Sequence, residues 1–207
     1  MIIIKVYCGD DFSEGAKAMK VTKAQARENR ERIVETASML FRERGYDGVG
    51  VAELMAAAGF THGGFYKHFG SKADLMAEAA ACSFARSAEQ STELNIADFI
   101  KQYLSREHRD TPAQGCTMAA LCADAGRQSE VIKQTFAVGI ENQLATLADK
   151  DADLSKTEQH QARANRIAAF AQVVGAIVLS RACPDDSALA DEILDVCRTK
   201  ILGQYDQ

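Results

Sequence analysis

The chain has 207 residues, a length that suits one large domain or two small ones. Hydrophobic residues make up 47% of it and charged residues 26%, which is typical of an ordinary globular protein. We find no stretch that is apolar for long enough to span a membrane, so we expect no membrane protein. The net charge of −5 is unevenly spread. Residues 21–72 carry eight Lys and Arg against six Asp and Glu, whereas residues 73–207 carry thirteen against twenty.

Cysteine occurs six times, at positions 8, 82, 116, 122, 183 and 197. These positions include no Cys-x-x-Cys pair and form no zinc-ligand pattern with the four histidines, so we expect no metal site. The first residues, MIIIKVY, are apolar but too few for a signal-peptide core, and no small-residue cleavage site follows them. We therefore expect a cytoplasmic protein with reduced thiols.

Residues 1–20 follow no helical pattern, and we expect a loosely ordered extension there, with Met19 as an alternative start of the chain. From residue 21 onward alanine is frequent, β-branched runs are few, and only Pro112 and Pro184 interrupt the chain, which predicts an all-α fold. Loops are predicted at 108–112 and 149–153. The predicted helices span residues 22–44, 51–58, 61–69, 71–90, 96–105, 116–128, 129–148, 157–182 and 187–202.

The stretch between residues 30 and 75 organises the chain. A first apolar stripe ends at Gly45 and a shorter second one ends at Gly59, after which a tight link leads into a third helix. Phe65 and Phe69 lie four residues apart, so both point into the same core. Two short helices joined by a glycine-containing turn, with aromatic residues behind the second one, are typical of a helix-turn-helix.

The third predicted helix carries the chemistry that a DNA contact needs, because the second helix of such a motif enters the major groove. Thr61 is the predicted N-cap and offers a hydroxyl beside free backbone N–H groups, which bind phosphate. Gly63 and Gly64 have no bulk, so the backbone can approach DNA closely. The predicted DNA-contact residues are Thr61, His62, Gly63, Tyr66, Lys67, His68 and Lys72.

The segment LFRERGYDGVGVAELMAAAGF, followed by THGGFYKHFGSK, resembles the N-terminal DNA-binding domain of the TetR family of bacterial repressors. The resemblance implies a transcriptional repressor that binds a palindromic double-stranded DNA operator. It also implies that Tyr66, His68 and Lys72 touch phosphate, and we expect His62 and Lys67 at the base edges.

One position departs from the family pattern. Members carry a hydroxyl residue just before the second helix, where it touches a phosphate, but this chain reads Val49, Gly50, Val51. That contact is therefore not expected here. The missing hydroxyl and the small basic excess leave open a helical binding module that has lost DNA binding, and a helical bundle without any nucleic-acid role is a further alternative.

By this resemblance the chain divides into an extension at 1–20, a helix-turn-helix DNA-binding domain at 21–70, and a helical effector-binding and dimerisation domain at 71–207. In the family the last two helices pair with those of a second copy, which implies a homodimer. Residues 167–179 are almost wholly apolar and must be covered on several sides, and Gly175 and Ala176 permit close helix approach. A two-fold dimer would also read two half-sites. The alternative is that the same stripes are the core of a monomer.

Family members bind a small effector between their middle helices, and binding moves the DNA-binding domains apart. An aromatic and methionine-containing set in this part of the chain suits an apolar or aromatic effector. Ordinary core packing would explain each of these residues as well. The candidate lining residues are Phe84, Phe99, Tyr103, Met118, Leu121, Phe136, Ile140, Phe170 and Val174.

A rival trigger is thiol chemistry, in a repressor of the same fold that senses an oxidant or an electrophile. Cys116 is the candidate because it begins a predicted helix, where the helix dipole favours the reactive thiolate. Cys122 lies six residues further along, about 9 Å away on another face of the helix, which argues against a disulfide between the two. The alternative is that both are buried as small hydrophobic residues.

An enzyme would need a nucleophile with its base, a metal cluster or a cofactor loop, and no such spacing is visible. The triplet His108, Arg109, Asp110 lacks the downstream asparagine of a kinase catalytic loop, and Gly70 is followed by Ser71 rather than by the lysine of a phosphate-binding loop. We therefore expect no enzyme and no cofactor.

Overall fold

The computed structural model describes residues 22–91, 96–146 and 155–203. The predicted extension at 1–20, with Cys8, and the predicted loop at 149–153 lie outside these residues. The elements in the described part are all helical, which confirms the all-α fold. They are α1 (Lys23–Arg44), α2 (Val51–Ala57), the 3₁₀-helix η1 (His62–Lys67), α3 (Lys72–Ser91), α4 (Ile96–Tyr103), α5 (Arg106–Asp110), α6 (Thr117–Ala125), α7 (Glu130–Thr146), α8 (Lys156–Arg181) and α9 (Ala188–Leu202).

Local chemistry accounts for several of the helix ends. The hydroxyl of Thr22 accepts from the N–H of Gln25 at 3.1 Å and begins α1. Ser155 and Glu158 form a reciprocal capping box at the start of α8. Gly45 ends α1 with a φ of 75°, a conformation that glycine adopts without strain.

Two local predictions are wrong. The region predicted as a loop at 108–112 includes most of a short helix, α5, because Ser105 accepts from the N–H of His108 at 3.2 Å and because the Arg109 side chain is buried against α8. The third helix is 3₁₀ rather than α, and the Thr61 side chain makes no capping hydrogen bond to it. Tertiary anchoring, rather than a cap, therefore holds this short element.

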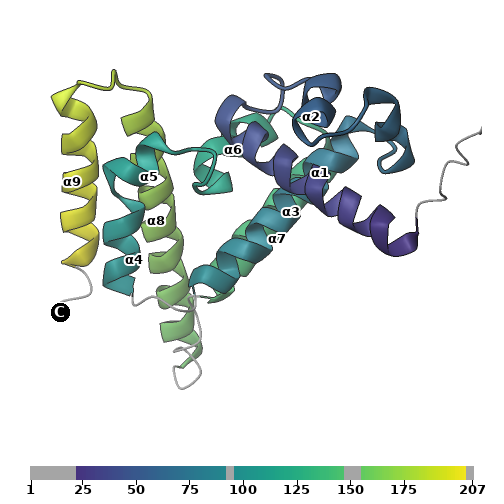
Figure 1. Ribbon diagram of the computed structural model, residues 1–207. Coiled ribbons are helices and arrows are strands. Elements are labelled where there is room, and N and C mark those ends of the chain that lie inside the picture. Colours follow the sequence, from purple (N-terminus) through teal and green to yellow (C-terminus); the bar gives the residue numbers. More distant parts are fainter. Residues whose placement is uncertain (1–21, 92–95, 147–154, 204–207) are drawn as a thin grey trace, which may run out of the picture.

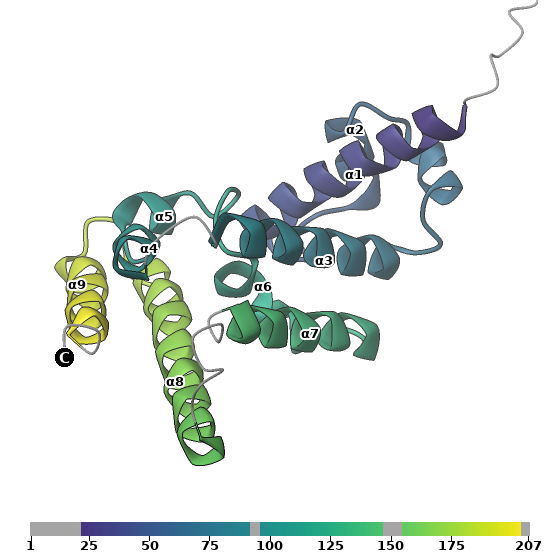
Figure 2. The same ribbon diagram turned by 90° about the horizontal axis from the view of Figure 1, so that it is seen from below.

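The helices divide into two ends with a connecting layer (Figure 1). Helices α1, α2 and η1 lie at one end, and α4, α5, α8 and α9 lie at the other. Helix α3 runs beside α7 between the two ends, and α6 also lies there, an arrangement that Figure 2 shows from below.

Two hydrophobic cores follow from this arrangement. The first core surrounds Phe41 and Phe65 and joins α1, α2, η1 and α3 to residues of α6 and α7. The second core surrounds Ile177 and Leu194 and joins α4, α8 and α9 to Ala119 of α6. The first core therefore extends across residue 70, where the sequence predicts the boundary between the two domains.

Helix α8 leaves much of its apolar surface uncovered. Its most apolar 18-residue window is only 17% buried, and Leu179 is 60% exposed. Among the described residues this one helix has the length and composition of a membrane-spanning helix, contrary to the expectation from the sequence. The expectation counted only the continuous apolar run at 167–179, whereas an 18-residue window that tolerates two charged residues extends beyond this run. Length and composition do not separate a lipid-covered helix from one that a protein partner covers.

Candidate DNA-binding surface and effector cavity

The turn between α2 and η1 depends on a glycine and an aromatic anchor. Gly59 has a φ of 82°, which reverses the chain, and the N–H of Phe60 donates to the carbonyl of Met55 at 2.8 Å. Phe65 of η1 is fully buried, and its ring lies 5.5 Å from the ring of Phe69. These contacts hold one side of η1 against the first core and leave its other side facing solvent.

Five of the seven predicted DNA-contact residues are exposed on η1 or directly before it. Tyr66 is 68% exposed although its neighbour Phe65 is 0% exposed, so an aromatic ring is presented outward from an otherwise buried aromatic cluster. The exposed candidates are Thr61, His62, Gly63, Tyr66 and Lys67.

The other two candidates are partly buried and engaged with the protein. Lys72 donates through Nζ to the carbonyl of Tyr46 at 2.5 Å and so ties the start of α3 to the turn after α1. Arg30 donates to the carbonyl of His68. Burial, helped by Arg30 and Lys67, lowers the pKa of His68 and so favours its neutral form. A phosphate contact by Lys72 would require its ammonium group to share or exchange this carbonyl.

A cavity of about 600 Å³ lies among the middle helices, where the two cores meet. Of the nine predicted effector residues, five line it, namely Phe84, Phe99, Tyr103, Met118 and Phe170. Four do not. Leu121 and Phe136 are buried in the first core, Val174 packs against the second, and Ile140 is half-buried on α7 outside the cavity lining.

Most of the remaining lining is polar, and apart from Cys116 the sequence did not point to it. Polar side chains at helical spacing look the same whether they face solvent or a cavity, so periodicity carries no signal for them. Glu107 is the only charged residue among them. They are Ser87, Gln102, Ser105, Glu107, His108, Thr111, Gln114, Gly115, Cys116, Thr117 and Gln143.

His108 connects α4, α5 and the start of α6. Its Nδ1 lies 2.7 Å from the carbonyl of Tyr103, and its Nε2 lies 3.0 Å from the backbone nitrogen of Cys116. A carbonyl only accepts and a backbone N–H only donates, so the proton must be on Nδ1 and the ring must be neutral. Burial lowers the pKa of His108, which agrees with this geometry.

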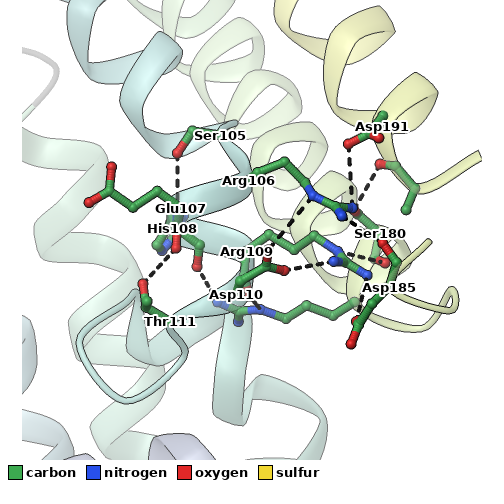
Figure 3. Close-up of polar contacts among 12 residues, drawn as sticks. Ser105, Arg106, Glu107, His108, Arg109, Asp110, Thr111, Ser180, Asp185 and Asp191 are labelled. Carbon is green, nitrogen blue, oxygen red and sulfur yellow. Dashed lines mark hydrogen bonds and ion pairs between the residues drawn. The ribbon is translucent and has the colours of Figure 1, made fainter. Parts of the chain in front are cut away.

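Helix α5 is clamped to α8 and to the turn that follows it (Figure 3). The buried side chain of Arg109 donates to the carbonyls of Ser180 at 3.1 Å and Cys183 at 3.2 Å, and it pairs with Asp110. Arg181 donates back to the carbonyls of Arg109 and His108, both at 2.8 Å. These hydrogen bonds therefore fix α5, which forms one wall of the cavity, to the helices of the second core.

The segment between α5 and α6 is fastened in the opposite direction, to α1. Arg42 donates through Nε and Nη2 to the carbonyl of Ala113, at 2.8 and 2.5 Å, and through Nη1 to the hydroxyls of Ser38 and Ser83. At the far end of α6, Asp124 accepts from the N–H of Tyr46 at 3.1 Å. Two polar contacts thus connect the cavity wall with the first core.

The described cysteines are all free thiols. Cys116 is partly buried in the cavity wall, and burial raises the pKa of Cys122 to about 11, which disfavours its thiolate. No group of three or more His, Cys, Asp or Glu side chains in the described part of the chain could hold a metal ion.

The sequence model of the family described as "Bacterial regulatory proteins, tetR family" matches residues 33–79, the segment that builds α1 from its middle, α2, η1 and the first part of α3. The match covers this segment alone, and it is therefore a resemblance of the N-terminal helices to that family. Over 57 residues the chain is 40% identical to the HTH-type transcriptional regulator AcrR of Shigella flexneri, which covers 28% of this chain and 26% of that protein. Over 81 residues it is 33% identical to the HTH-type transcriptional repressor AcnR of Corynebacterium glutamicum, which covers 39% of this chain and 43% of that protein.

These matches span less than half the length of the two relatives. The fold likeness extends further. The crystal structure of the reduced form of E. coli NemR superposes with a TM-score of 0.68 over 84% of this chain and 96% of that chain, at 21% sequence identity. At this identity the likeness shows a common fold and nothing about the effector.

Proposed function

We propose that this chain is a sequence-specific transcriptional repressor that binds a palindromic DNA operator and leaves it when a small molecule occupies the cavity. The observation that carries the proposal is the bond between Arg42 of α1 and Ala113, because it joins the segment that lines the cavity to the helix-turn-helix. Such a regulator acts where the chromosome is, so we propose a cytoplasmic location. The printed name of AcnR, a repressor, supports this direction of control.

The exposed side of η1 supplies the DNA contacts in this proposal. His62 and Lys67 would reach base edges, and Tyr66 with the Thr61 hydroxyl would reach phosphate. Gly50 begins α2 without a side-chain cap, and open space surrounds the position of its absent Cβ. The phosphate contact that a hydroxyl would make there is therefore left to the backbone.

A second copy of the chain would cover the apolar surface of α8 and α9. Leu179 and Val178 on α8 and Leu189 and Val196 on α9 are between 43% and 60% exposed. Gly175 on α8 has nothing within 4 Å of the place its Cβ would take, so a partner helix could approach closely. Pairing of these helices would bury the surface and set two copies of η1 on successive half-sites.

Release would follow from movement of the segment 111–116 and of α6. One side of the cavity wall, α5, is fixed to α8 by Arg109 and Arg181. A ligand that occupies the cavity would therefore displace the other side, which Arg42 and Asp124 connect to the first core. The ligand shifts the equilibrium only as far as it prefers the displaced arrangement.

The test is DNA binding by the purified protein with fragments of its own upstream region at two salt concentrations. Affinity should fall steeply with salt, because phosphate contacts release counterions, and one dimer should bind each operator. Lys67→Ala should cost about 1–3 kcal/mol and change the sequence preference, whereas Lys72→Ala should weaken all sequences alike. Binding that ignores salt and both lysines would contradict the proposal.

Thiol sensing is the second candidate, and the position of Cys116 in the cavity wall favours it. A hydroperoxide would oxidise the thiol to a sulfenic acid and leave as water or an alcohol, and the added oxygen would press on the same segment 111–116. Cys116→Ser should then abolish release from DNA by peroxide, while Cys82→Ser, at an exposed site, should not. Release of the Cys116→Ser protein by peroxide would exclude Cys116 as the sensor.

A further inference from the structure

The cavity wall offers a ligand almost no charge. Among the described residues that line it, Glu107 alone carries a full charge, and its side chain is exposed on the solvent side of α5. The other polar groups are the amides of Gln102, Gln114 and Gln143, serine and threonine hydroxyls, and the side chains of Tyr103, His108 and Cys116. An anionic ligand would therefore lose its hydration without gaining a counter-charge, and a cationic ligand would meet only the solvent-exposed carboxylate of Glu107.

Two groups that could have become charged are held neutral. Both ring nitrogens of His108 are used by backbone groups, in the arrangement that only the neutral ring allows. The hydroxyl of Tyr103 is buried, and burial followed by the nearby Cys116 raises the pKa of Tyr103 well above its ordinary value. Neither residue supplies a cation or an anion at neutral pH.

The guanidinium group of Arg181 lies behind the wall and not in it. Arg181 donates through Nε and Nη2 to the carbonyls of Arg109 and His108, and it is not among the lining residues. Gly115 stands in front of it, because a Cβ on Gly115 would lie 2.9 Å from the His108 ring and 3.4 Å from Nη2 of Arg181. The close packing of this segment separates the cation from the cavity.

We propose that the cavity binds an uncharged aromatic amphiphile, with its ring among Phe84, Phe99 and Phe170 and a carbonyl or ether oxygen on the glutamine amides. This inference rests on the proposed function and specifies the effector of that same site. The aromatic side chains supply apolar area and edge-to-face contacts, and the amides fix orientation through hydrogen bonds. Phosphorylated and carboxylated ligands are disfavoured because the lining holds no cation for them.

The experiment uses isothermal titration calorimetry on the free full-length protein with three probes on one ring system. These are 2-acetylnaphthalene, 2-naphthoate and 2-naphthylmethylammonium, which are neutral, anionic and cationic. The neutral probe should bind at least about tenfold more tightly than either ion, a difference of about 1.4 kcal/mol. Tighter binding of the naphthoate would overturn the proposal and indicate that Arg181 is accessible, and no binding of the neutral probe at about 1 mM would also overturn it.

A charge-switch variant shows whether the probe is in the cavity. Gln143→Lys adds a cation to the lining and should reverse the preference, with at least about a tenfold gain for naphthoate. The matched change Gln134→Lys, at an exposed position of the same helix outside the cavity, should leave all three affinities unchanged. Identical behaviour of the two variants would overturn the proposal. Because no DNA is present, a failure of DNA binding would contradict only the proposed function.

Discussion

The two hydrophobic cores differ in how completely one protomer covers them. In the first core Phe41, Leu54 and Phe65 are fully buried, and the surrounding helices close around them. In the second core Ile177 is equally buried, but Leu179, two residues away on the same helix, is 60% exposed. The first core is therefore complete within one chain, whereas the second still has apolar surface to bury.

The cavity lies where these cores meet, and its walls belong to both. Phe84 packs against the first core, whereas Phe99, Tyr103 and Cys116 pack against the second. A ligand in this place touches the part that carries the proposed DNA contacts and the part that carries the proposed dimer surface at once. The comparison suggests four experiments, ordered from the largest expected effect to the smallest.

The largest effect should come from the closed core. Phe65→Ala leaves a cavity under η1 and should lower the free energy of unfolding by about 3–5 kcal/mol. The neighbouring Tyr66→Ala removes an exposed ring and should change it by less than about 0.5 kcal/mol while weakening DNA binding. Urea unfolding followed by circular dichroism measures both. Equal losses in the two variants would show that η1 does not depend on the first core.

The open core should respond through association rather than folding. Leu179→Glu places a charge on the uncovered face of α8 and should shift the protein from dimer to monomer, because an unpaired charge in an apolar interface costs several kcal/mol. Val131 on α7 is also 60% exposed, so Val131→Glu is the matched control and should leave the mass unchanged. Sedimentation velocity at micromolar concentration reports the mass. If the protein without either substitution is monomeric, the proposed dimer is wrong.

The hydrogen bonds of Arg42 should matter more for the effect of a ligand on DNA binding than for the stability of the fold. Arg42→Met removes the hydrogen bonds to Ala113 and should cost about 1–3 kcal/mol of stability, since a partly buried acceptor loses its donor. It should also reduce the effect of any cavity ligand on DNA affinity. Arg86→Met, which breaks only an exposed pair with Glu35, should cost at most about 1 kcal/mol and leave that effect intact. Full ligand response in Arg42→Met would show that the signal takes another route.

The smallest expected effect is the change of stability with pH. Because burial lowers the pKa of His108 in the folded protein, its neutral form stabilises the fold above the ordinary histidine pKa of about 6.5, and this contribution is lost as the pH falls. Denaturant midpoints measured at pH 7.5 and 5.5 should therefore drop on acidification. His108→Gln should flatten the drop, whereas His160→Gln, at an exposed site, should not. An unchanged slope in His108→Gln would place the acid sensitivity elsewhere.

Local pattern was enough for the helices and for the DNA-binding motif. Apolar periodicity, the glycines at 45 and 59 and the aromatic pair at 65 and 69 are all properties of neighbouring residues, so the all-α fold and the family resemblance follow from them. The same reasoning failed at α5, where the helix depends on the burial of Arg109 against α8, about seventy residues away in sequence.

The tertiary structure alone decided which residues share the cavity. Phe136 and Leu121 have the same apolar character as Phe99 and Met118, yet the first pair is sealed in a core and the second lines the cavity. Periodicity tells which face of a helix is buried but not against which neighbour, and it is silent on polar side chains such as Gln143 that face an internal space. The hydrogen bonds of Arg42, His108 and Asp124 likewise join elements that are far apart in the chain, because long-range packing and not local propensity brings their partners within reach.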